Sequence, residues 1–114
     1  MAIIGAILGD ISGSQYEFLR PKDLDWKKCE LFTDKCYFTD DSVMTLAAKL
    51  AVKNGISFAD SYRRFGRKYP NAGYGEMFDA WLHWDDEEAY NSFGNGSAMR
   101  CSYIGEHFNG EKKL

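Results

Sequence analysis

The stretch Thr39–Gly55, TDDSVMTLAAKLAVKNG, decides the fold of this 114-residue chain. Its Thr-Asp-Asp-Ser opening is typical of a helix start, because short oxygen-bearing side chains accept hydrogen bonds from the free amides of a first turn. Apolar residues then recur at helical spacing, and Asn54-Gly55 supplies a C-terminal signal. The pattern predicts a helix from this corner to Asn54, with an apolar face made of Val43, Leu46, Ala47, Leu50 and Ala51.

Helical spacing also dominates on both sides of this stretch. The first 19 residues are predicted to form a helix, and a loop with short irregular structure is expected over 20–37. Another helix is expected after Ser57 and ends at Pro70. Short helices are expected around 77–82 and from Ala98. Since no segment alternates apolar and polar residues over six or more positions, the predicted fold class is all-α. The predicted aromatic face of the helix after Ser57 consists of Phe58, Tyr62, Phe65 and Tyr69.

Length and composition fit one ordinary globular domain. The chain is 45% hydrophobic and 16% aromatic, an aromatic content too high for a disordered segment. No apolar run approaches the roughly 20 residues of a membrane helix. The net charge of −3 argues against a nucleic-acid partner. The three cysteines form no CxxC pair and no signal-peptide pattern is seen, so a reducing, cytoplasmic location is expected.

Three glycines mark the first predicted helix. Gly5, Gly9 and Gly13 recur every fourth residue and form one stripe. Each glycine costs a helix interior roughly 1 kcal/mol, so a crossing helix or a bound ligand is expected to approach the backbone there. On the adjoining face, Asp10 and Glu17 align with a serine hydroxyl. This alignment is read either as a ligand-facing carboxylate pair or as a solvated acidic stripe.

Thr39, Asp40 and Asp41 place a hydroxyl and two carboxylates on consecutive residues at a helix start. Neighbouring side chains diverge at a loop-to-helix corner, and Mg²⁺, Mn²⁺ and Ca²⁺ prefer such oxygen donors. The alternative is capping alone, since acidic residues stabilise a helix N-terminus by up to about 1 kcal/mol. His83 and His107 have no second soft ligand nearby in sequence, so a metal bound here is expected to be a hard cation.

A glycine-rich loop, Gly94-Asn95-Gly96-Ser97, precedes the last predicted helix. Free backbone amides in such a loop bind phosphate, and Arg100 one turn later adds positive charge. The alternative is an ordinary turn in which a polar side chain of the loop caps the helix. Asn71–Gly75 is a weaker version of the same pattern, in which Tyr74 either stacks on a base or fills a gap.

Four segments with chemistry-bearing residues follow one another along the chain, at 5–17, 38–43, 69–75 and 92–100. They read GAILGDISG with Glu17 four residues later, FTDDSV, YPNAGYG and SFGNGSAMR. As a set they resemble the ADP-ribosylglycohydrolase family, which includes the dinitrogenase-reductase-activating glycohydrolases. The resemblance extends from about Ile3 to Gly105, which is nearly the whole chain.

The resemblance implies an all-helical, metal-dependent hydrolase that removes ADP-ribosyl groups from proteins or small acceptors by cleaving the bond at C1 of the ribose. Two divalent ions, Mg²⁺ or Mn²⁺, are expected beside that ribose. By position, Thr39, Asp40 and Asp41 match the family's first cluster of metal ligands. Glu17 matches its acidic residue near the metals, which makes Glu17 and Asp41 the implied catalytic residues.

The resemblance also implies residues along the path of the substrate, which would be ADP-ribose itself or an ADP-ribosylated protein. The glycine-rich loop corresponds to the ligand-facing loop of the family. The implied substrate-binding residues are Asp10, Tyr74, Gly75, Asn95, Gly96 and Ser97.

The family's second metal-binding cluster, Asp-x-Asp followed by Thr or Ser, has no match within 42–114, and family members are longer than this chain. Glu111–Leu114 has the composition of a helix start. Residues 1–114 are therefore expected to be one incomplete domain, the N-terminal portion of the family's fold. Three functions remain open: a part of an enzyme completed by a second chain or by further helices, a module that binds ADP-ribose or metal without turnover, and a structural fragment that self-associates through exposed apolar surface.

Overall fold

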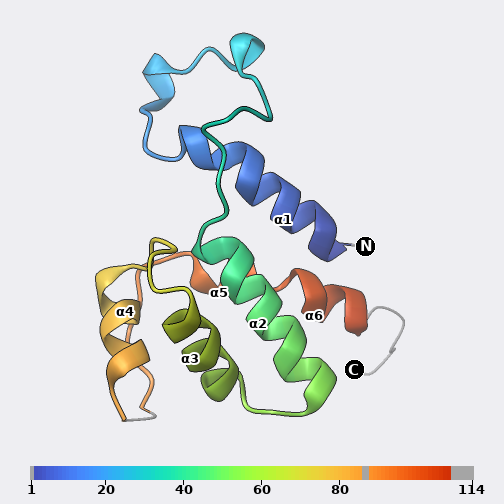
Figure 1. Cartoon of the computed structure of the whole chain (residues 1–114), viewed down its shortest axis with the longest axis vertical. Coiled ribbons are helices and arrows are strands. Elements are labelled where there is room, and N and C mark those ends of the chain that lie inside the picture. The colour runs from blue at the N-terminus through green and yellow to red at the C-terminus, as the bar shows by residue number, and fades with distance from the viewer. Residues whose placement is uncertain (1, 86–87, 109–114) are drawn as a thin grey trace.

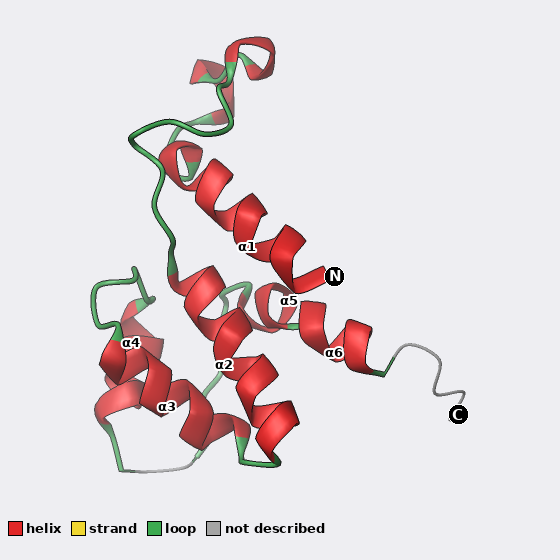
Figure 2. Ribbon diagram, turned by 45° about the vertical axis from the view of Figure 1, so that its right-hand side comes forward, coloured by secondary structure: helices red, strands yellow, loops and turns green. Residues whose placement is uncertain are grey.

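The computed structural model describes residues 2–85 and 88–108 of the chain, and Glu111–Leu114 lies outside these ranges. This part contains helices and no strand, which confirms the all-α prediction (Figure 1; Figure 2). None of its helices is long and apolar enough to cross a membrane. The α-helices are α1 (Ala2–Gly13), α2 (Asp40–Asn54), α3 (Phe58–Lys68), α4 (Glu76–His83), α5 (Gly96–Arg100) and α6 (Ser102–His107).

The central helix is α2, which packs against α1, α3, α5 and α6 (Figure 2). It begins after Thr39, whose Oγ1 accepts a hydrogen bond from the Asp41 amide (3.2 Å), and it ends at Gly55, where φ is +62°. Both ends confirm the sequence prediction. Because α2 has neighbours on several sides, residues outside the predicted apolar face are also buried. Leu46, predicted on that face, is instead 40% exposed. The buried residues are Ser42, Val43, Met44, Thr45, Ala47, Ala48 and Ala51.

Buried hydroxyl groups tie other helices to α2. Ser61 of α3 donates to the Ala47 carbonyl at 2.6 Å, and Thr45 of α2 donates to the Met99 carbonyl of α5 at 2.9 Å. A buried hydroxyl without a partner would be costly, so each bond is made only in one register of its two helices. These contacts fix α3 and α5 on the central helix.

Helix α3 begins after Ser57 as predicted, and the Ser57 hydroxyl accepts from the Asp60 amide at 3.0 Å. Only part of its predicted aromatic face packs against the core. Tyr62 and Phe65 pack against the core formed by Val43, Met44 and Ala72, whereas Phe58 and Tyr69 remain partly exposed.

The predicted helix over the first 19 residues is too long, because α1 ends at Gly13 and a 3-10 turn, η1 (Ser14–Tyr16), follows. Ser14 explains the break. Its hydroxyl donates to the Ile11 carbonyl at 2.9 Å and accepts from the amide of Tyr37, 23 residues along the chain, at 3.0 Å. This long-range contact stops the helix where propensity alone would continue it.

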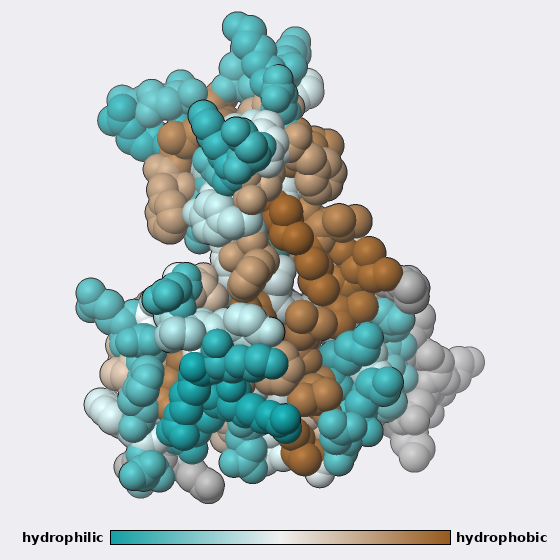
Figure 3. Space-filling view, in the orientation of Figure 1, coloured by the Kyte–Doolittle hydropathy of each residue, from teal (hydrophilic) through white to brown (hydrophobic). Residues whose placement is uncertain are grey.

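The glycine stripe of α1 is uncovered. A Cβ built on Gly5, Gly9 or Gly13 meets no atom within 4 Å, so within the described residues no helix crosses the stripe as one alternative expected. Helix α1 packs through another face, on which Ile3 is buried, and leaves Leu8 exposed. Figure 3 shows hydrophobic surface along this helix.

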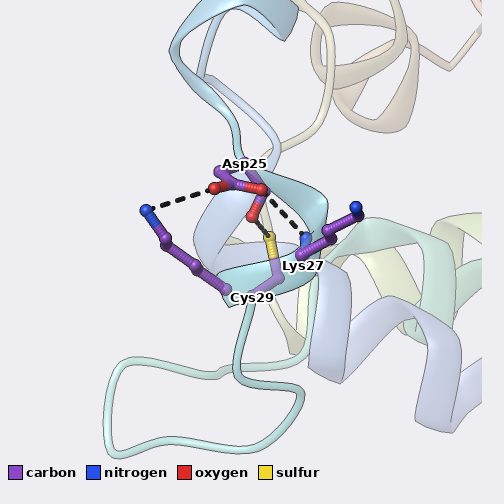
Figure 4. Close-up of polar contacts among 4 residues, drawn as sticks. Asp25, Lys27 and Cys29 are labelled. Carbon is purple, nitrogen blue, oxygen red and sulfur yellow. Dashed lines mark hydrogen bonds and ion pairs between the residues drawn. The ribbon is translucent and has the colours of Figure 1, made fainter.

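Residues 14–38 leave the helical body and return, as expected for a loop with short irregular structure (Figure 1). The excursion contains η2 (Pro21–Asp23) and η3 (Trp26–Lys28) and raises the radius of gyration to 15.6 Å, against about 13 Å for a compact chain of this length. Asp25 organises its tip: the side chain accepts from the Lys27 amide at 3.2 Å, and the carbonyl accepts from Cys29 Sγ at 3.4 Å (Figure 4).

Candidate functional site

The N-terminus of α2 is pinned to α1 by the Asp10 carboxylate. Asp10 Oδ1 accepts from Thr39 Oγ1 at 2.6 Å, and Oδ2 accepts from the Thr39 amide at 2.8 Å. Oδ2 also accepts from the Ser42 hydroxyl (2.6 Å) and amide (3.2 Å). Thr39 and Ser42 are both buried, so one carboxylate satisfies four donors in a position shielded from water. The corner that carries Asp40 and Asp41 is thereby fixed in space.

A second contact attaches the 70–75 loop to the same corner. The Asp40 amide donates to the carbonyl of buried Ala72 at 2.8 Å. This bond places Gly73 and Gly75 beside the two carboxylates, and α4 begins directly after them.

These elements enclose a pocket of about 260 Å³. One wall carries three carboxylates, from Asp40 and Asp41 at the start of α2 and from Glu17 after η1. The 92–96 loop and α5 also line the pocket, and α5 contributes Arg100, the one basic side chain among the described residues of the lining. The lining residues are Glu17, Asp40, Asp41, Gly73, Gly75, Phe78, Tyr90, Ser92, Gly94, Asn95, Gly96, Met99 and Arg100.

The carboxylates of this pocket are electrostatically coupled. The pKa of Asp40 is raised from 3.8 to about 6, chiefly by burial and then by the charge of Asp41, with a smaller contribution from Glu17. The pKa of Asp41 is also raised, first by burial and then by Asp10. Arg100 opposes both shifts. A pocket that raises acid pKa values in this way favours the arrival of a cation, which would compensate the negative charge.

Asp40→Asn is expected to stabilise the metal-free chain by about 1 kcal/mol at pH 7 and by much less at pH 4. The unfolded carboxyl ionises near pH 3.8 and the folded one near 6, so stability contributed by the protonated form is lost as pH rises through this window. The side chain keeps some contact with water, which reduces the effect.

Urea unfolding at the two pH values measures this difference. The matched control is Asp34→Asn, which removes the same charge from an exposed turn and is expected to have little effect at either pH. Equal changes in stability at pH 4 and pH 7 for Asp40→Asn would contradict the expectation.

The sequence-predicted site residues divide into two groups. Glu17, Asp40, Asp41, Gly75, Asn95 and Gly96 all line the pocket. Thr39 and Asp10 lie behind it and hold the corner. Tyr74 points elsewhere: its hydroxyl donates to the Tyr69 carbonyl at 2.9 Å, its ring lies 5.7 Å from that of Phe78, and burial raises its pKa to about 12. Ser97 lines a separate groove near Ile104.

The whole sequence, residues 1–114, matches the family model described as ADP-ribosylglycohydrolase. The chain belongs to the ADP-ribosylglycohydrolase family. No solved structure matches it. Membership assigns the chain to proteins of the ADP-ribosylglycohydrolase type in general.

The oxygen donors of the pocket suit a hard divalent cation. Neither Asp40 nor Asp41 is in an ion pair within the described ranges, whereas the buried Thr39 hydroxyl bonds to Asp10 and to the Asp41 amide and does not line the pocket. However, no three His, Cys, Asp or Glu side chains in this part of the chain are grouped closely enough to hold an ion. Asp40 and Asp41 alone offer fewer oxygens than the six of an octahedral shell, so one ion would need further ligands from water, and two ions would need further protein oxygens.

Two aromatic residues line the pocket that sequence patterns did not single out for the site, Phe78 and Tyr90. Phe78 lies in a segment for which the sequence predicts only a short helix, and its position at the pocket wall follows from how α4 packs on α3. Tyr90 lies outside the four segments that carry the resemblance and follows no recognisable spacing. Asp10 is predicted on the substrate path, and its role as a structural pin depends on partners 29 and 32 residues away.

Proposed function

We propose that this ADP-ribosylglycohydrolase-family chain binds an ADP-ribosyl group in the acidic pocket and contributes to metal-dependent hydrolysis of the bond at C1 of the ribose. The observation that carries the proposal is the convergence of Glu17, Asp40 and Asp41, from two separate elements, on one pocket that Arg100 also lines. Substrates would be an ADP-ribosylated protein or a small ADP-ribosylated acceptor.

Asp40 and Asp41 would hold a Mg²⁺ or Mn²⁺ ion. Such an ion, when bound, orients ribose hydroxyls and lowers the pKa of a bound water. Ion binding requires the ionised carboxylates, so it is expected to weaken below about pH 6, where Asp40 is protonated.

The carboxylates would supply the charge stabilisation and the proton transfer of the reaction. Cleavage of a ribosyl C1 bond passes through an oxocarbenium-like state, whose positive charge is stabilised by nearby carboxylates such as Asp41. Glu17 is exposed and lines the same pocket, and in this proposal it would accept a proton from the attacking water. Asp10 keeps the corner rigid while these groups act.

Release of free ADP-ribose from ADP-ribosyl-arginine, in the presence of Mg²⁺ or Mn²⁺, tests the proposal. Asp40→Ala and Asp41→Ala are each expected to lower the rate by roughly 100-fold or more, because each removes a metal ligand. Asp34→Ala serves as the control for loss of a carboxylate outside the pocket. Release that is equal in all four proteins would rule out this pocket as the site of reaction.

A second candidate function is binding of ADP-ribose without turnover. It is favoured by the lack, within the described residues, of three grouped ligands for a metal ion. In that case ADP-ribose is expected to raise the melting temperature of the chain while no product is released with either ion.

A further inference from the structure

Arg100 is held in an unusual position at the end of α5. Its Cζ atom lies 4.9 Å from the ring centroid of Tyr62 and 4.8 Å from that of Phe78. Its Nε is buried and has no hydrogen-bond partner. The guanidinium is therefore supported by aromatic rings, and the Arg100 side chain lines the acidic pocket and two neighbouring grooves.

The charge of Arg100 is also left without a direct counter-ion. Within 2–85 and 88–108, no carboxylate oxygen lies within 4.0 Å of the guanidinium, although Asp40 and Asp41 line the same pocket. Aromatic rings offset part of the cost of partly burying a cation, but a full ion pair offsets more. An anion from outside the chain would complete this environment.

Because residue 96 is glycine, the Arg100 guanidinium lies directly against the loop backbone. A Cβ built on Gly96 collides with Nη1 of Arg100, so any side chain at this position would displace the guanidinium. Glycine therefore lets the loop backbone and the guanidinium form one continuous surface at this end of the pocket.

We infer that Arg100 binds the phosphate oxygens of the ligand and thereby sets its orientation in the pocket. The planar guanidinium presents paired N–H donors that match two phosphate oxygens, a geometry that lysine cannot reproduce. The carboxylates of Asp40 and Asp41 repel phosphate, so the phosphates lie toward Arg100 and the ribose toward the carboxylates. This inference rests on the proposed function for the identity of the ligand, and Arg100 acts in it as a binding and positioning residue.

Equilibrium binding of ADP-ribose and of adenosine, measured calorimetrically in EDTA, tests the inference without any metal or turnover. Arg100→Met is expected to weaken ADP-ribose binding by about 10-fold while leaving adenosine binding unchanged, and Arg100→Lys is expected to recover part of the loss. The matched control is Arg63→Met, because the Arg63 Cζ also lies over a ring, 4.2 Å from the centroid of Trp81, but outside the pocket. This control is expected to bind both ligands as the unmodified chain does.

A second measurement uses the unmodified chain and so does not depend on how the variants fold. Inorganic pyrophosphate is expected to compete with ADP-ribose and not with adenosine. Equal weakening of both ligands by Arg100→Met, or failure of pyrophosphate to compete, would overturn the inference. Phosphate-selective binding without hydrolysis would support the inference and contradict the proposed hydrolysis. Hydrolysis by the unmodified chain, together with unchanged ADP-ribose binding in Arg100→Met, would support the proposed hydrolysis and contradict the inference.

Discussion

Asp10→Ala is expected to lower the free energy of unfolding by about 3 kcal/mol, one of the largest effects of any substitution in this chain. The Asp10 carboxylate accepts four hydrogen bonds from Thr39 and Ser42, and both of these residues are buried. Alanine leaves these donors unsatisfied in a position from which water is largely excluded. Urea unfolding monitored by circular dichroism measures the loss.

Two further variants sharpen this test. Asp10→Asn keeps one acceptor oxygen but brings an amide N–H group toward donors, so a smaller loss is expected than with alanine. Asp34→Ala removes an exposed carboxylate and is expected to change stability by no more than about 0.5 kcal/mol. If Asp10→Ala behaved like Asp34→Ala, the pin between α1 and α2 would not contribute to stability.

The contact between Gly66 of α3 and Leu82 of α4 is expected to show strong coupling in a double-mutant cycle. A Cβ built on Gly66 lies 2.5 Å from both Cδ atoms of Leu82, which is fully buried. Gly66→Ala is therefore expected to cost about 1–2 kcal/mol despite its better helix propensity. Leu82→Ala is expected to cost about 3 kcal/mol by opening a cavity.

The effect of Gly66→Ala on the free energy of unfolding is expected to change sign in a chain that also carries Leu82→Ala. In the Leu82→Ala background, Gly66→Ala has room and should stabilise the chain by about 1 kcal/mol. Gly5→Ala is the matched control, because Gly5 is also helical but has no atom within 4 Å of its Cβ position. Additive effects of Gly66→Ala and Leu82→Ala would show that the two helices do not meet in this way.

Helix boundaries that depend on capping by residues close in sequence could be predicted from the sequence. Thr39 and Gly55 bound α2 as expected, and Ser57 starts α3, because capping depends on residues close in sequence. The end of α1 could not be predicted, since the contact between Ser14 and Tyr37 that stops it spans 23 residues. Leu46 is exposed for a similar reason: the face that α2 buries depends on where its neighbours lie.

The candidate site also combines residues that could be predicted from the sequence with residues whose roles depend on long-range packing. Asp40 and Asp41 stand out in sequence because they cluster at a helix start, and the structure places them in a pocket with Glu17. Asp10 carries no local sign that it would bond to residues about 30 positions away. The aromatic setting of Arg100 likewise depends on packing between helices that are distant in sequence.

The most direct test of the account is a crystal structure of the chain with ADP-ribose and Mn²⁺. Ligand density is expected in the 260 Å³ pocket, with the ribose and the ion beside Asp40 and Asp41 and the phosphates beside Arg100. Density for ADP-ribose elsewhere on the surface, with this pocket filled only by water, would contradict it.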